Sequence, residues 1–186
     1  MHRQRRFAAV CLVAMIVAVN VGLVLAAEGP EKPKPGPELQ KLGYFVGKWT
    51  SEGDMKPSPA GPGGKFTSTD NCTWYEGGFA VVCNSTGKGP MGPTKGLGIM
   101  SYSTEDQVYT YYGVDNTGMV MSTVPKGTVQ GDTWTYADES KMGGKTFKSR
   151  YTIQQLSPSS YTFKWEMMGD DGTWMAMMEG KSTKAK

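Results

Sequence analysis

The feature that most restricts the fold of this chain is the alternation of apolar and polar side chains in a series of short segments. In the segment 160–168, polar or charged residues separate the large residues Tyr161, Phe163, Trp165 and Met167. A period of two with one apolar face is typical of antiparallel strands that bury one side and expose the other. Clusters of Gly, Pro and Asp lie between such segments, which indicates many short strands joined by short turns.

We expect ten such strands between Trp49 and the C-terminus, including one over 119–129 in which Pro125 and Gly127 introduce a bulge. Strands joined by hairpins leave two unpaired edges, and closure into a barrel removes both. The predicted fold is therefore an all-β, ten-stranded antiparallel up-and-down β-barrel. The alternation does not exclude a two-sheet sandwich, so that architecture stays open at this point.

The chain divides into three parts of different composition. Residues 1–27 combine a basic start with an apolar run and a small-residue exit, which is the pattern of a secretory signal peptide. Because the run is nearly long enough to span a membrane, an uncleaved anchor is the alternative. Residues 28–37 form a Pro-rich linker, and residues 38–186 form the barrel domain. This domain begins with a short helix over 38–45, which closes one end of the barrel. We expect the protein to be secreted or periplasmic.

The charge balance and the histidine count both change when residues 1–27 are set aside. The chain has 20 Lys and Arg against 17 Asp and Glu, and three arginines of that segment account for the whole excess. A balanced domain gives no electrostatic reason to bind nucleic acid or an anionic membrane surface. The only histidine, His2, also lies there, which rules out histidine triads, histidine metal sites and a histidine-ligated haem in the domain. We predict no catalytic residues, no metal, no cofactor and no enzymatic activity.

The two cysteines of the domain, Cys72 and Cys83, are predicted to face each other across a hairpin. A two-residue turn at Gly77 and Gly78, with positive φ at both positions, pairs them. Counting outward from this turn makes them a hydrogen-bonded pair with Cα atoms about 5.5 Å apart, which is within disulfide range. In an exported protein this pairing indicates a disulfide, and a pair of reduced, buried thiols is the alternative.

A series of motifs resembles a known family. Gly47, Lys48 and Trp49, after a short helix and at the start of the first strand, resemble the Gly-x-Trp signature of calycins, the lipocalin and fatty-acid-binding superfamily. The full series is Leu42-Gly43-x-Phe45-x-Gly47-x-Trp49, Trp74 to Phe79, Gly131-Asp132-x-Trp134, Gly172-x-Trp174 and Glu179-Gly180-x-x-x-Lys184. Over about residues 38–186, these motifs look like an uncharacterised family of exported bacterial proteins with a domain of unknown function and a calycin-like barrel.

The resemblance implies a structural contact but no established activity. In calycins a basic residue of the last strand packs over the signature tryptophan, so Lys181 or Lys184 would pack over Trp49 as a cation–π contact. Fatty-acid binders hold a carboxylate with an Arg-x-Tyr pair. Here Arg150 and Tyr151 are adjacent and fall on opposite faces of a strand, which counts against the same carboxylate site.

A ten-stranded barrel is wide enough to hold a small ligand, and large side chains on the strand faces could line it. The candidate lining residues are Trp74, Tyr112, Trp134, Tyr136, Tyr151, Phe163 and Trp165. We predict that the barrel binds a small apolar or aromatic ligand. The alternative is a structural or interaction module whose interior these side chains fill.

Copper(I) binding through methionine pairs is a further hypothesis. Met119 with Met121, and Met175 with Met177, each place two thioethers on one face of an expected strand, and thioethers suit Cu(I). Methionine also fills irregular cores, and no Cys or His completes a site, which counts against a metal centre.

Overall fold

The computed structural model describes residues 33–58, 61–118, 121, 123–142 and 144–185. The chain divides into two units, Met1–Pro33 and Lys34–Lys186, and the second contains all of the described residues except Pro33. The predicted signal peptide, 1–27, and residues 28–32 of the predicted linker lie outside the described residues.

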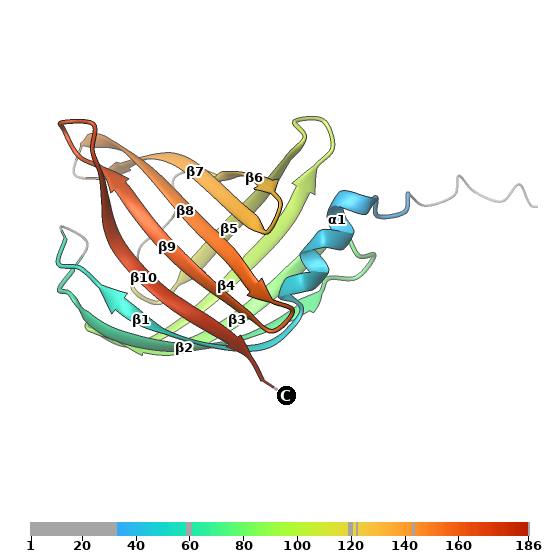
Figure 1. The fold of residues 1–186 in the computed structure, drawn as a ribbon, viewed down its shortest axis with the longest axis horizontal. Coiled ribbons are helices and arrows are strands. Elements are labelled where there is room, and N and C mark those ends of the chain that lie inside the picture. The colour runs from blue at the N-terminus through green and yellow to red at the C-terminus, as the bar shows by residue number, and fades with distance from the viewer. Residues whose placement is uncertain (1–32, 59–60, 119–120, 122, 143, 186) are drawn as a thin grey trace, which may run out of the picture. The chain divides into compact units, whose positions relative to one another are not determined.

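The second unit is a closed barrel of ten antiparallel strands preceded by a short helical segment, as Figure 1 shows. The helical segment is α1 (Pro37–Lys41) followed by the 3-10 turn η1 (Leu42–Phe45). The strands are β1 (Gly47–Met55), β2 (Gly64–Trp74), β3 (Ala80–Gly89), β4 (Gly92–Ser103), β5 (Val108–Asp115), β6 (Lys126–Gln130), β7 (Thr133–Met142), β8 (Lys145–Ser157), β9 (Ser160–Met168) and β10 (Trp174–Lys184). Each strand pairs with its sequence neighbours, and β1 closes the ring on β10. The predicted up-and-down barrel is confirmed, and the sandwich is excluded.

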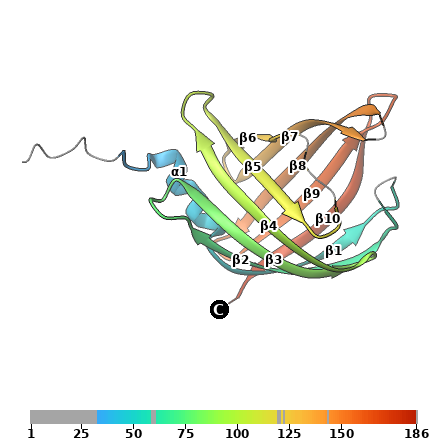
Figure 2. The ribbon, with the colours of Figure 1, turned by 180° about the vertical axis from the view of Figure 1, so that it is seen from behind.

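The helical segment lies at the end of the barrel where β1 begins and β10 ends (Figures 1 and 2). Pro37 stands in the first turn of α1, where its missing N–H removes no helical hydrogen bond. The buried side chains of this segment are Leu39, Leu42 and Phe45. The Phe45 ring meets Trp134 edge-on, with centroids 5.1 Å apart. These contacts fill this end with apolar side chains, and we refer to it as the closed end.

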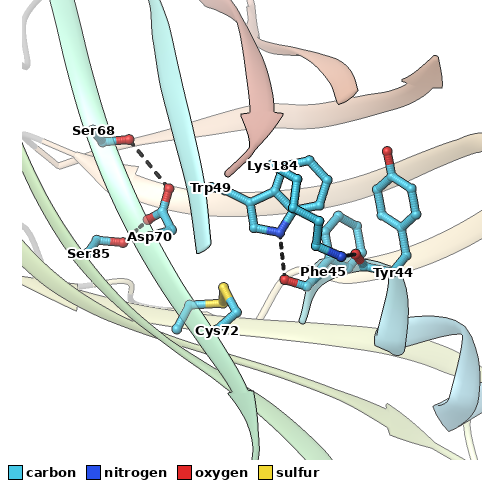
Figure 3. The surroundings of a disulfide bond; sticks show 9 residues. Tyr44, Phe45, Trp49, Ser68, Asp70, Cys72, Ser85 and Lys184 are labelled. Atoms are coloured by element: carbon cyan, nitrogen blue, oxygen red, sulfur yellow. Dashed lines mark hydrogen bonds between the residues drawn. A yellow bond between two sulfur atoms is a disulfide. The ribbon is translucent and has the colours of Figure 1, made fainter. Parts of the chain in front are cut away.

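The Gly-x-Trp motif joins the helical segment to β1. Trp49 is 1% exposed, and its indole N–H donates to the Phe45 carbonyl over 2.8 Å. The Lys184 ammonium lies 5.1 Å from the Trp49 ring centroid and donates to the Tyr44 carbonyl (Figure 3). A Cβ on Gly47 would lie 2.7 Å from Cε of Lys184, and Gly47 has φ +123°, so only glycine fits there.

Cys72 and Cys83 form a disulfide, as the hairpin register predicts. Both predicted turn glycines have positive φ, +88° at Gly77 and +75° at Gly78. The turn itself differs from the prediction, because the Tyr75 N–H bonds to the Ala80 carbonyl and leaves a loop of four residues. Counting from that bond makes the cysteines a non-hydrogen-bonded pair, in which Cα atoms lie closer together. Their Cα atoms are accordingly 4.0 Å apart rather than about 5.5 Å.

The strand expected over 119–129 is shorter in the structure. It is the five-residue β6 (Lys126–Gln130), which pairs with β5 at only two positions. Pro125, which has no N–H to donate to a ladder, directly precedes this strand. Positions 119, 120 and 122 of the predicted strand lie outside the described residues.

Candidate functional site

The inner face of the barrel is marked by the buried Trp49, and the strand register then assigns the inner residues of the other strands. One row of paired inner positions runs from β10 through β1, β2, β3 and β4 to β5. Its members are Lys184, Trp49, Asp70, Ser85, Gly96 and Asp115. The next row away from the closed end contains Ser182, Ser51, Ser68, Gly87 and Thr94. Apart from Trp49, these two rows consist of polar or small side chains.

The small residues on β3, β4 and β5 leave the interior beyond the closed end without large side chains at several positions. Ser85 pairs with Gly96, and Gly87 pairs with Thr94. We call this part of the barrel the open half. Glycine and serine contribute little volume, so a barrel lined by them encloses space unless neighbouring rings cover them.

Asp70 is the carboxylate nearest the middle of this polar lining. The hydroxyl of Ser85 donates to one of its oxygens, and the hydroxyl of Ser68 lies 3.4 Å from the other (Figure 3). Burial raises the pKa of Asp70, and the two serine hydrogen bonds oppose that shift only in part. Among the described residues, no Lys or Arg forms an ion pair with Asp70.

A second polar pair lies beside Asp70. Ser51 and Ser182, 7% and 0% exposed, share a hydrogen bond between their hydroxyls across β1 and β10. Tyr161 also bonds to Ser182, and burial, with a smaller effect of the Asp70 charge, raises the pKa of Tyr161 to about 12. These hydroxyls satisfy one another and supply no counter-charge to Asp70.

Tyr111 borders the interior space. It pairs with the buried Met100, and its ring lies against Gly98 and Gly113, where a Cβ would come within 3.0 and 2.9 Å of the ring or its hydroxyl. Burial first, and then the charges of Asp70 and Asp115, raise the pKa of Tyr111. Nevertheless 37% of its surface is accessible. Tyr111 therefore combines an inward-facing register position with a surface that solvent reaches.

The hydroxyl of Tyr136 is buried inside the barrel. It is 5% exposed, and its hydroxyl forms no hydrogen bond within the part of the chain that the structure describes. Its ring centroid lies 6.5 Å from that of Tyr111, and burial followed by the effect of Tyr111 raises the pKa of Tyr136. Buried hydroxyls are normally hydrogen-bonded, so this group is an unused hydrogen-bonding position in the interior, covered by protein atoms.

The comparisons with known proteins add a family to this geometry. The profile of DUF1579, described as a protein of unknown function, matches residues 34–184. The chain belongs to the DUF1579 family. No curated protein matches it. This family member is similar to the crystal structure of Rv2717c from M. tuberculosis, with 12% identity, a TM-score of 0.57, and coverage of 81% of this chain and 99% of that one. It is also similar to the S-type phycobiliprotein lyase CPES from Guillardia theta, with 14% identity, a TM-score of 0.53, and coverage of 79% and 92%. At these identities the likeness shows the barrel fold alone.

The predicted lining residues of this family member fall into three groups. Trp134 is 2% exposed beneath the helical segment, and Trp74 packs near Gly43, so both fill the closed end. Four others lie on the inner face farther along the barrel: Tyr136, Tyr151, Phe163 and Trp165. Tyr112 does not line the interior. It pairs with Ile99 on the outer face and is 38% exposed, because its neighbour Tyr111 takes the inner position.

Sequence reasoning missed Asp70, Ser85 and Tyr111. A signal for the first two was present, because each lies two residues from a cysteine of the predicted Cys72–Cys83 pair and therefore shares its face. The structure also places Lys184 rather than Lys181 over Trp49, since Lys181 pairs with Glu52 on the outer face. Arg150 and Tyr151 lie on opposite faces, with Arg150 bonded to Glu166 outside the barrel.

The outer face carries an open depression of about 950 Å³ across β1, β2, β8, β9 and β10. Its walls include Arg150, Lys164 and Glu166. Glu166 lies 2.6 Å from the Arg150 guanidinium and 2.7 Å from the Lys164 ammonium, and Arg150 stacks 4.3 Å from the Trp174 ring centroid. Glu166 therefore pairs with both basic side chains of this wall.

The methionine hypothesis loses its geometric basis where it can be tested. Met119 lies outside the described residues. Met175 is 51% exposed, and a β-bulge between Ala176 and Met178 interrupts the alternation that would place Met175 and Met177 on one face. Over the described ranges, no group of three or more His, Cys, Asp or Glu side chains is arranged to hold a metal ion. Within the same ranges, no helix has the length and hydropathy needed to cross a membrane.

Proposed function

We propose that this DUF1579 protein binds a small apolar or aromatic ligand in the open half of its barrel. The observation that carries the proposal is the 37% accessibility of Tyr111, whose ring faces inward from β5. Ligand sites of this kind combine apolar and aromatic walls with a few convergent polar groups, and the open half has both.

The aromatic walls come from three strands. The rings of Tyr151 and Phe163 are stacked, with an interplanar angle of 14° and centroids 5.9 Å apart. Phe163 also contacts Phe66, whose ring centroid is 6.1 Å away. Trp165 pairs with Tyr151 on the same inner face. Flat rings in this arrangement offer stacking and edge contacts to an aromatic ligand.

The structural neighbours support the proposal only through the shared fold. A barrel of the same kind serves a phycobiliprotein lyase, which at 14% identity transfers no residue role to this chain. Export belongs to the same proposal. The disulfide between Cys72 and Cys83 supports an oxidising compartment, where such bonds persist, and the composition of residues 1–27 supports cleavage of a signal peptide.

The test is a titration with 1-naphthalenemethanol, a neutral aromatic probe, followed by calorimetry. Thr94 faces the interior opposite Gly87, and its neighbour Lys95 faces outward. We expect the wild type to bind the probe, Thr94→Trp to weaken binding at least about tenfold by filling the open half, and Lys95→Trp to bind like the wild type. No binding by the wild type, or equal binding by Thr94→Trp, would contradict the proposal and favour a filled structural module.

A further inference from the structure

The inner face carries an excess of acid away from the closed end. The acidic residues at inner strand positions are Asp70, Asp115 and Asp138. The basic residues at such positions, among those the structure describes, are Lys145 and Lys184. Lys145 is exposed at the tip of the β7–β8 hairpin. Beyond the closed end, the inner strand positions that the structure describes therefore carry three carboxylates and one ammonium group, that of Lys145 at the rim.

Lys184 does not neutralise Asp70, although both belong to the row that contains Trp49. The Trp49 ring lies between them, and the Lys184 ammonium points toward the Tyr44 carbonyl, 3.2 Å away (Figure 3). On the other strands that face Asp70, the nearby ionisable groups are Tyr111, Tyr151 and Tyr161. All three are neutral at physiological pH, because burial raises their pKa values further above the ordinary range.

Asp70 also has unused hydrogen-bonding capacity. A carboxylate accepts about four hydrogen bonds, and Ser68 and Ser85 supply two. An ionised carboxylate that is withdrawn from water without a cation is costly unless a partner arrives. The Tyr136 hydroxyl, which has no partner among the described residues, is a neutral acceptor on the same inner face, covered by protein atoms.

We infer that the ligand carries a protonated amine or amidine, and that Asp70 is the residue that pairs with it inside the barrel. This inference rests on the proposed function and specifies the class of ligand. An ammonium group has donors and no acceptor, which suits a site made of a carboxylate, a free tyrosine hydroxyl and aromatic faces. The rings of Tyr111 and Tyr151 offer cation–π contacts to the same group.

The experiment compares three probes that share one ring: 1-naphthylmethylammonium, 1-naphthalenemethanol and 1-naphthoate. Calorimetry at pH 7.5 measures the affinities of these probes for residues 28–186 of the wild type and for two variants of the same length. Asp70→Asn removes the inner charge, whereas Glu52→Gln removes an acid from the outer face of the neighbouring strand β1. We expect the ammonium probe to bind the wild type about tenfold more tightly than the alcohol, and the naphthoate to bind most weakly. Asp70→Asn should abolish that difference, and Glu52→Gln should preserve it.

The outcomes separate the inference from the proposed function. If the alcohol binds and the ammonium probe binds no better, or if Asp70→Asn keeps the preference, the inference is wrong and the proposed function stands. If none of the probes binds, the proposed function fails. If a variant does not fold, a pH series on the wild-type protein tests the inference instead. The affinity for the ammonium probe should rise with pH as Asp70 ionises, while that for the alcohol stays constant, and a flat profile for the ammonium probe would overturn the inference.

Discussion

The hydroxyl of Ser85 donates to the carboxylate of Asp70 across the β2–β3 pair, one inner position beyond the disulfide. The disulfide fixes the register of this hairpin, so it also fixes the position of an acid inside the barrel. Burial makes that acid unfavourable in its ionised form. Residues that reduce stability in this way are often kept for binding, and this relationship leads to the first prediction.

Asp70→Asn should stabilise the protein at pH 7 by about 1 kcal/mol, the common size of a single-substitution effect. The pKa of Asp70 is higher in the folded than in the unfolded state, so the free energy of unfolding falls as pH rises from the unfolded pKa through the folded one. The amide removes this loss and can still accept from Ser85. The gain should therefore disappear below about pH 4, where Asp70 is protonated in both states. Thermal melts from pH 3 to 8 measure it, and a gain that does not change with pH would contradict the account.

Removing the disulfide should destabilise the barrel. The double variant Cys72→Ala and Cys83→Ala should lose about 3 kcal/mol of unfolding free energy, because the bond no longer restricts the unfolded chain. Urea denaturation gives the value. Dithiothreitol should shift the wild-type midpoint toward that of the variant and leave the variant unchanged. If dithiothreitol leaves the urea midpoint of the wild type unchanged, Cys72 and Cys83 are not joined by a disulfide.

Gly47→Ala tests the closed end. The added methyl would contact the Lys184 side chain, and the backbone at φ +123° disfavours any residue other than glycine. We expect a loss of about 1–3 kcal/mol. Gly36→Ala is the matched control, because nothing lies within 4 Å of its Cβ position and its φ is −73°. Equal stability of the two variants in urea denaturation would show that the contact between Gly47 and Lys184 is unimportant.

Adjacent tyrosines on β5 separate the inner from the outer face. Tyr111→Ala should weaken binding of 1-naphthalenemethanol several-fold by removing a ring from the lining, whereas Tyr112→Ala should leave the affinity unchanged. Calorimetry on both variants gives the comparison. The reverse order would place the site on the exposed apolar surface formed by Leu97, Ile99, Tyr112 and Val114.

How well the sequence predicts the fold and the inner-face residues differs from strand to strand. The segment 160–168 alternates cleanly, and its inner face is as predicted. On β5, Tyr111 and Tyr112 are equally suited to either face, so the pattern alone cannot select the inner one. On β2, polar residues occupy both faces from Thr67 to Asp70, which hides an inner acid from any rule that places polar residues outside. Only the hairpin register carries that information.

The bulge in β10 shows a second limit. Alternation predicts that Met175 and Met177 share a face, but the extra residue between Ala176 and Met178 shifts the register against β9. A bulge depends on how two strands bend around each other, and no single residue near Ala176 predicts its position. The turn after β2 shows the same limit. Gly77 and Gly78 give its position in the sequence, but its length depends on the hydrogen bond between Tyr75 and Ala80.

Locating a bound probe would show whether a small ligand occupies the open half of the barrel. Nuclear Overhauser measurements between 1-naphthylmethylammonium and the isotopically labelled protein report which residues the ring touches. We expect contacts to Tyr111, Tyr151 and Phe163, together with chemical-shift changes at Asp70. Contacts confined to Tyr112 and Ile99 on the outer face, or no contacts at saturating probe, would contradict it.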